Sequence, residues 1–134
     1  MILVDTSVLS HAFRRRTKSS AEIPQVGILR SLVAEDRPVV VPGVVLQELL
    51  SGVKTSEEFE RLQDLMDGFP PLLATREHHI AAAKISNACR RGGIAASTID
   101  CLIAAMTLAA KSQLLTADED FRLMVPHRGL RLHD

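Results

Sequence analysis

The fold is decided by the opening stretch Ile2-Leu3-Val4-Asp5-Thr6-Ser7-Val8-Leu9. Three apolar residues that end in an acid predict a short buried strand over 2–4. A helix is expected to begin near Thr6, so a strand is followed directly by a helix. This order is the building unit of an α/β protein, whose ligands bind beyond the carboxyl ends of the strands.

The same alternation continues along the chain. Short apolar runs predict further strands at 39–41, 72–74 and 114–116, with a last short strand at 130–132. Helices are expected over 21–35, from 43 onward, over 55–67, 76–91 and 97–111. We therefore predict a three-layer α/β/α sandwich with a mostly parallel sheet of four to five strands, formed by a single domain over 1–134.

Composition restricts the function in three ways. Lys plus Arg and Asp plus Glu number sixteen each, so the net charge gives no sign of a polyanionic partner. Four Phe and no Trp or Tyr leave no aromatic platform for stacking bases. The start of the sequence lacks the features of a signal peptide, and no run is long enough to cross a membrane, so a cytoplasmic protein is expected.

Four acids occupy the positions where such a fold places its chemistry. Asp5 ends the first strand, Glu48 lies early in the helix after the second, and Asp118 follows the strand at 114–116. Asp100 lies in the first turn of the helix that opens near 97. Each acid has a structural alternative: Asp5, Asp100 and Asp118 fit helix caps or first turns, and periodicity makes Glu48 a solvated residue.

The joint pattern favours a metal site. Carboxylates that cluster raise one another's pKa, and a cation is needed to keep them ionised together. Because neither His nor Cys is among them, a hard divalent ion such as Mg²⁺ is indicated. The cysteines, Cys89 and Cys101, lack metal-ligand spacing and are expected to be buried thiols. The five histidines show no zinc spacing either.

Four segments together resemble the PIN-domain nucleases, and most closely the VapC-type toxins of bacterial toxin–antitoxin pairs. They are the opening stretch already quoted, Leu46-Gln47-Glu48-Leu49-Leu50-Ser51-Gly52, Ser97-Thr98-Ile99-Asp100-Cys101-Leu102-Ile103-Ala104-Ala105, and Leu114-Leu115-Thr116-Ala117-Asp118-Glu119-Asp120-Phe121. Their order and spacing match the family over essentially the whole chain.

The resemblance implies a PIN-like fold, an endoribonuclease dependent on Mg²⁺ or Mn²⁺, and a homodimer. It also implies a VapB-like antitoxin that inserts into or covers the active site, in a toxin–antitoxin hetero-oligomer. Asp5, Glu48, Asp100 and Asp118 become the catalytic residues. Ser7 and Thr116 become supporting polar groups, and Asp120 is an alternative to Asp118.

The expected reaction is hydrolysis of an RNA phosphodiester by a water that a metal on Asp5 and Asp100 activates. Asp118 and Glu48 would hold further water or a second ion, or act as general base. Two basic clusters are candidates for phosphate contacts or simply solvated surface. They are Arg14-Arg15-Arg16 with Lys18, and Arg90-Arg91.

Other functions fit the sequence less well. An aspartate-based phosphotransferase usually has a second acid two residues after the first, where this chain has Ser7. A receiver-type signalling domain needs paired acids after the first strand, which are missing, and no Gly-rich phosphate loop is found. A PIN nuclease that processes RNA outside a toxin–antitoxin pair and a non-catalytic PIN-like interaction protein stay open as alternatives.

Overall fold

The computed structural model describes residues 1–14, 22–124 and 129–134. At its centre four strands form one parallel sheet in the order β3-β2-β1-β4. They are β1 (Ile2–Val4), β2 (Val39–Pro42), β3 (Pro71–Leu72) and β4 (Gln113–Leu115). The strand expected at 130–132 is reduced to a single parallel bridge between Leu132 and Leu114.

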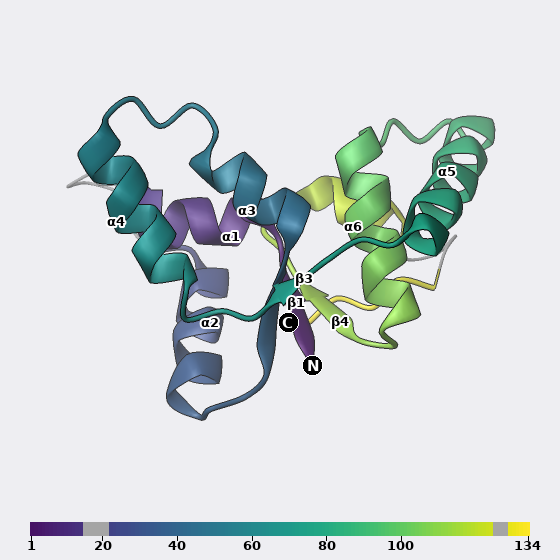
Figure 1. Ribbon diagram of the computed structural model, residues 1–134. Coiled ribbons are helices and arrows are strands. Elements are labelled where there is room, and N and C mark those ends of the chain that lie inside the picture. Colours follow the sequence, from purple (N-terminus) through teal and green to yellow (C-terminus); the bar gives the residue numbers. More distant parts are fainter. Residues whose placement is uncertain (15–21, 125–128) are drawn as a thin grey trace.

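Helices cover both faces of the sheet, which confirms the predicted three-layer architecture. Figure 1 shows α1 to α4 on one side of the strands and α5 and α6 on the other. The helices are α1 (Thr6–Leu9), which continues into the π-helical turn η1 (Ser10–Arg14), α2 (Pro24–Ala34), α3 (Gly43–Leu50), α4 (Ser56–Met66), α5 (Arg76–Arg91), α6 (Thr98–Ala109) and the 3₁₀ segment η2 (Glu119–Met124).

The chain's route explains the two layers. From β1 it passes to β2 and then β3 in one direction, and from β3 it returns to β4 on the other side of β1. Crossovers between parallel strands are right-handed, so reversing the direction moves the connecting helices to the opposite face. The first two crossovers therefore supply α1 to α4, and the last supplies α5 and α6.

Local signals set several element boundaries. The helix expected over 21–35 begins at Pro24, whose ring suits the first helical position. Thr55 caps α4 by accepting a hydrogen bond from the Glu58 backbone, as its capping pattern predicts. The strand expected at 72–74 is instead Pro71–Leu72, because β2 ends at Pro42, the partner of Leu72, and Leu73 is left 70% exposed.

The core is aliphatic, as the scarcity of aromatic residues requires. Seven consecutive residues of α6, 101–107, are buried, because this helix is enclosed by α5 and the sheet. Phe121 of η2 is a fully buried aromatic residue. Both cysteines are free and buried, as predicted.

In the described residues, no helix combines the length and the apolar character that crossing a membrane requires. Of the first basic cluster, Arg14 ends η1, whereas Arg15, Arg16 and Lys18 lie outside the described residues.

Candidate metal centre

The candidate site lies where the strand order reverses. Because the chain leaves β1 toward β2 but reaches β4 on the other side, the connections after β1 and β4 diverge. Asp5 follows β1 directly, and Thr116 follows β4 directly. The backbone of Asp5 continues the pairing, since its N–H donates to the carbonyl of Leu115 (3.0 Å).

The Asp5 carboxylate is buried and held by two hydroxyl groups. It is only 5% exposed, and its Oδ2 accepts hydrogen bonds of 2.8 Å from Ser7 Oγ and from Thr116 Oγ1. Asp5 does stand at the N-cap position of α1, but its side chain makes no capping hydrogen bond there. The two hydroxyls instead fix the direction of a buried carboxylate.

The same hydroxyls connect the two strand ends. Ser7 Oγ accepts from the backbone N–H of Ala117 (3.0 Å), and Thr116 Oγ1 accepts from the backbone N–H of Asp118 (3.0 Å). The loop after β4 is therefore tied to the turn after β1. Ser7 and Thr116 therefore lie directly against the Asp5 carboxylate.

Three further acids meet beside this network. Asp100, Asp118 and Asp120 each place a carboxylate oxygen within 4.8 Å of the others. Asp100 is half-buried, and desolvation raises its pKa from the usual 3.8 to about 6. A hydrogen bond from Ser97 opposes this shift, whereas the negative charges of Asp118, Asp5 and Asp120 add to it.

The capping functions that compete with the metal hypothesis are also present. Ser97 caps α6 by accepting a hydrogen bond from the backbone N–H of Asp100 (3.0 Å). Asp118 Oδ1 accepts a hydrogen bond from the backbone N–H of Asp120 (2.9 Å), and this bond lies at the start of η2. One carboxylate oxygen of Asp118 is thus engaged locally. Capping fixes where these acids lie and does not prevent them from gathering.

Glu48 lies outside the group of three acids but is connected to the site. It is half-buried, and its Oε1 accepts a hydrogen bond of 2.8 Å from Thr6 Oγ1, next to Asp5 in the chain. The solvated position that periodicity predicts for Glu48 is therefore wrong. The reason is that α3 packs against α1, which covers a helix face that its apolar stripe leaves open.

Asp120 is the residue that the sequence undervalued. The sequence favours Asp120 only as an alternative to Asp118, yet the structure brings both into one group with Asp100. The tight 3₁₀ conformation of η2 causes this, since it starts at Glu119 and turns the chain back directly after Asp118. The run Asp118-Glu119-Asp120 was the available signal.

Comparison with known proteins identifies the family of this chain. A family model described as the PIN domain matches residues 2–125. The chain belongs to the PIN domain family. Within that family, "VapC ribonuclease Mb1587" of Mycobacterium bovis is 32% identical over 123 residues, which cover 90% of this chain and 89% of the relative. The resemblance to VapC proteins is thereby confirmed.

Solved structures share the same fold. VapBC2 from Rickettsia felis, determined with a DNA fragment from its promoter, superposes with a TM-score of 0.78 at 19% identity, covering 99% of this chain and 98% of the other. A toxin–antitoxin complex from Klebsiella pneumoniae gives a TM-score of 0.70 at 15% identity, covering 97% and 95%. The PIN fold is therefore present along almost the whole chain.

Proposed function

We propose that this chain is a metal-dependent endoribonuclease and the toxin of a toxin–antitoxin pair, acting in the cytoplasm as a single nuclease domain. The observation that carries the proposal is the meeting of Asp100, Asp118 and Asp120 beside a buried, braced Asp5 at the β1–β4 edge. A curated relative that covers most of the chain is named a ribonuclease. Two free, buried cysteines suit a reducing compartment.

The residues of the site fit a hard divalent cation. Three carboxylates with oxygens within 4.8 Å repel one another, and the raised pKa of Asp100 reflects that repulsion in addition to burial. The group contains oxygen ligands and neither His nor Cys, which suits Mg²⁺ or Mn²⁺. A bound cation of this kind supplies Lewis acidity and a water of lowered pKa for attack on a phosphodiester.

The side chains of the site would have distinct roles as metal ligands, as positioning groups and as a proton acceptor. Asp5 and Asp100 are the principal metal ligands that we propose. Asp118 and Asp120 would place two further carboxylates near the same ion. Ser7 and Thr116 hold Asp5 Oδ2, so the Asp5 carboxylate cannot rotate away from the site. Glu48, oriented by Thr6, is placed to accept a proton or to hold a water at the rim.

The direct test is cleavage by the purified chain. Wild-type protein with Mg²⁺ or Mn²⁺ is expected to cut RNA, and excess EDTA is expected to stop cleavage. The Asp5→Asn variant should fold normally, because an amide oxygen can still accept from Ser7 and Thr116, and should be inactive. Mapping the cleaved ends after induced expression of both proteins identifies the target RNA. Full activity in Asp5→Asn with metal present would refute the proposed site.

The antitoxin is proposed to bind an apolar groove between α2 and α4. Two adjoining hollows of about 610 and 350 Å³ share Phe13, Val33 and Phe69 in their walls. The ring centroids of Phe13 and Phe69 lie 6.4 Å apart, and the side chain of Val33 is 53% exposed. Such a groove fits the apolar face of a partner segment. A structural neighbour of this chain is a toxin–antitoxin complex.

Val33→Glu is expected to weaken antitoxin binding at least about ten-fold, because the complex would bury an unpaired charge in the groove. Affinity would be measured by titration with the product of the neighbouring antitoxin reading frame. Ile80→Glu on α5, also an exposed apolar position, is the matched control and should bind normally. RNA cleavage should be unchanged in both variants. Equal loss of binding in the two would exclude the groove as the docking site.

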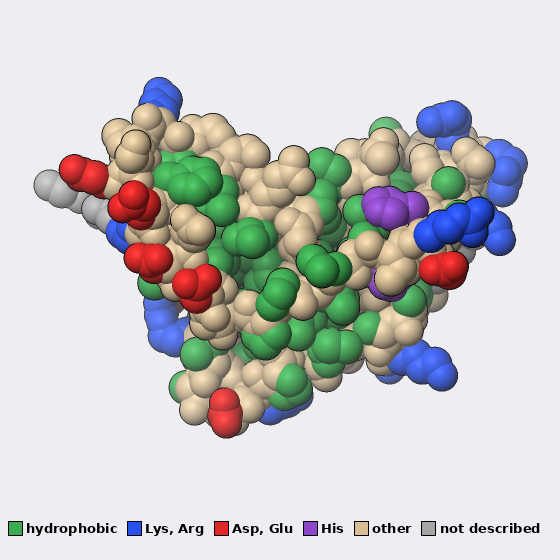
Figure 2. Space-filling model, in the orientation of Figure 1, with side chains coloured by type: hydrophobic (Ala, Val, Ile, Leu, Met, Phe, Trp, Pro, Cys, Tyr) green, Lys and Arg blue, Asp and Glu red, His purple; other side chains and the backbone are tan. Residues whose placement is uncertain are grey.

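A homodimer is also proposed. Among the exposed apolar side chains are Met1 (50%) and Leu73 (70%). Figure 2 shows hydrophobic side chains gathered over the middle of the molecule, between the two groups of helices. A second copy would cover such a surface.

Absence of a neighbouring antitoxin frame would instead favour a housekeeping RNA-processing enzyme. That outcome would leave the nuclease assignment standing and remove only the toxin role. A chain that folds and binds a partner but cleaves no RNA would be the non-catalytic interaction protein.

A further inference from the structure

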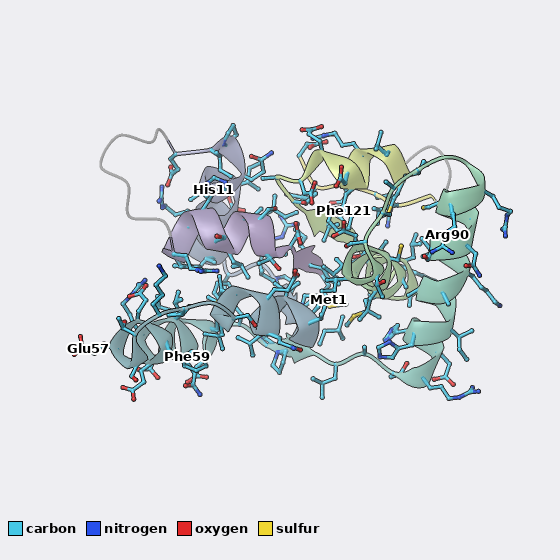
Figure 3. All side chains as sticks on the ribbon, turned by 90° about the horizontal axis from the view of Figure 1, so that it is seen from above. Met1, His11, Glu57, Phe59, Arg90 and Phe121 are labelled. Atoms are coloured by element: carbon cyan, nitrogen blue, oxygen red, sulfur yellow. The ribbon has the colours of Figure 1, made fainter. Side chains whose placement is uncertain are left out.

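The zero net charge of the chain conceals a strong separation of charge between two helices. α4 carries four acids and one base, whereas α5 carries four bases and one acid. They lie at opposite ends of the molecule: Figure 3 shows Glu57 of α4 at one end and Arg90 of α5 toward the other. In Figure 2, acidic groups gather on the α4 side, whereas the α5 side is mainly basic.

In the part of the chain that the structure describes, the two arginines at the end of α5 have no acidic partner. Arg90 and Arg91 are exposed, and among the described residues neither has a carboxylate within 4.0 Å. Nor do they serve to complete the helix end. The last carbonyls of α5 are taken by backbone donors, with Gly92 N–H bound to Ala88 (3.1 Å) and Ile94 N–H bound to Cys89 (2.8 Å). The two guanidinium groups are available to a ligand.

The end of α5 is held firmly at this place. Gly93 adopts a φ of +74°, which permits the sharp turn that closes the helix. Ile94 then packs against the hydrophobic core. Arg90 and Arg91 therefore project from a fixed point of the fold.

That fixed point lies on the same edge as the carboxylates. The loop 92–97 joins the end of α5 to the first turn of α6, which carries Asp100. In Figure 1 this loop joins the upper ends of α5 and α6, and the strands point toward the same side of the molecule. Six loop residues span no more than about 25 Å, so one RNA strand can reach from the acids to the arginines.

We infer that Arg90 and Arg91 are substrate-positioning residues, which bind backbone phosphates of the RNA strand that leaves the active site over the 92–97 loop. This inference rests on the proposed nuclease function. Repulsion from the acids of α4 disfavours the opposite path. Because the chain has no Trp or Tyr to stack bases, ionic contacts must supply much of the affinity.

The test separates binding from cleavage. A labelled single-stranded RNA oligonucleotide is titrated in EDTA at several KCl concentrations, with wild type and with Arg90→Gln/Arg91→Gln. Loss of two phosphate contacts should reduce the slope of log affinity against log salt by about 1.4, and weaken binding roughly twenty-fold at 0.1 M salt. The Arg90→Lys/Arg91→Lys variant should retain most of the slope, since the charges remain.

Arg37→Gln/Lys111→Gln is the charge-matched control. Both residues are exposed and lie just before β2 and β4, at the opposite edge of the sheet. An unchanged slope in this control, with a reduced slope in the α5 variant, supports the inference. Equal changes in the two variants, or none in the α5 variant, overturn it. A changed oligomeric state with an unchanged slope would also overturn it and identify a protein interface.

Cleavage kinetics provide the second readout. In the presence of metal, the α5 variant should show a raised KM with kcat retained, because its residues touch the strand away from the acids. A lowered kcat with KM retained would contradict the positioning role. If the wild type binds RNA with the predicted slope but cleaves none, the proposed function fails while the binding inference stands.

Discussion

Asp100→Asn is expected to lower RNA cleavage by on the order of 10³-fold or more, which corresponds to about 4 kcal/mol of transition-state stabilisation. The same substitution should make the metal-free protein more stable. Both effects have one origin: the Asp100 carboxylate is half-buried among other acids, which is unfavourable until a cation is bound. If Asp100 served only the fold, its substitution would not lower RNA cleavage while raising the stability of the metal-free protein.

The pH dependence follows from the raised pKa of Asp100, about 6 against the usual 3.8. Because the folded state holds the proton more tightly than the unfolded chain does, ionisation of Asp100 destabilises the fold. The penalty is fully present above about pH 6 and disappears as the pH falls from 6 toward 4. The Asn variant escapes it and should be the more stable protein at neutral pH.

Solvent screening reduces the energetic penalty of ionising Asp100. The full displacement of the pKa corresponds to about 3 kcal/mol, but the carboxyl group is half exposed and screened, so about 1 kcal/mol is expected. This amounts to roughly 4 °C in Tm for a domain of this length. Thermal unfolding in EDTA at pH 7.5 and at pH 4 measures it. A variant that is less stable than wild type at pH 7.5, or equally active, contradicts the assignment of Asp100.

Phe121→Ala is expected to cost about 3–5 kcal/mol of unfolding free energy, a large share of the total for a small domain. Phe121 is fully buried and lies in η2, directly after the acids Asp118 and Asp120. In Figure 3 it points inward from η2. Its ring anchors a short 3₁₀ segment that has few bonds of its own, so the metal affinity should fall together with stability.

Phe59→Ala is the matched control, because it removes the same ring from a position on α4 that is 40% exposed. Its cost should stay below about 1 kcal/mol. Denaturant titration gives both free energies, and Mn²⁺ binding measured calorimetrically reports the site. If the two variants lost equal stability, or if Phe121→Ala bound Mn²⁺ normally, η2 would not depend on this anchor.

Much of this protein could be read from local patterns. The apolar run before Asp5, the cap at Thr55 and the helix from Arg76 to Arg91 were all predictable, because each depends on neighbours a few residues away. Other boundaries shifted for tertiary reasons. Leu73 suits a strand by composition, but no neighbouring strand extends far enough to pair with it.

The candidate site likewise contains residues that local patterns predict and residues that only tertiary packing brings in. Asp5, Asp100 and Asp118 were predictable as candidates, since each follows a strand or opens a helix. Glu48 was recognised only through family resemblance, because the packing of α3 on α1 is invisible to periodicity. The contribution of Asp120 depends on the direction in which η2 turns.

By itself, then, the sequence determined that short apolar strands alternate with helices and that acids stand at several strand ends. Only the tertiary structure decided which of those ends are neighbours. The order β3-β2-β1-β4 places residues from the first and last parts of the chain in hydrogen-bond contact, as Thr116 and Asp5 show. Strand order is a long-range property, set by the packing of whole layers, and the local period of apolar residues carries no record of it.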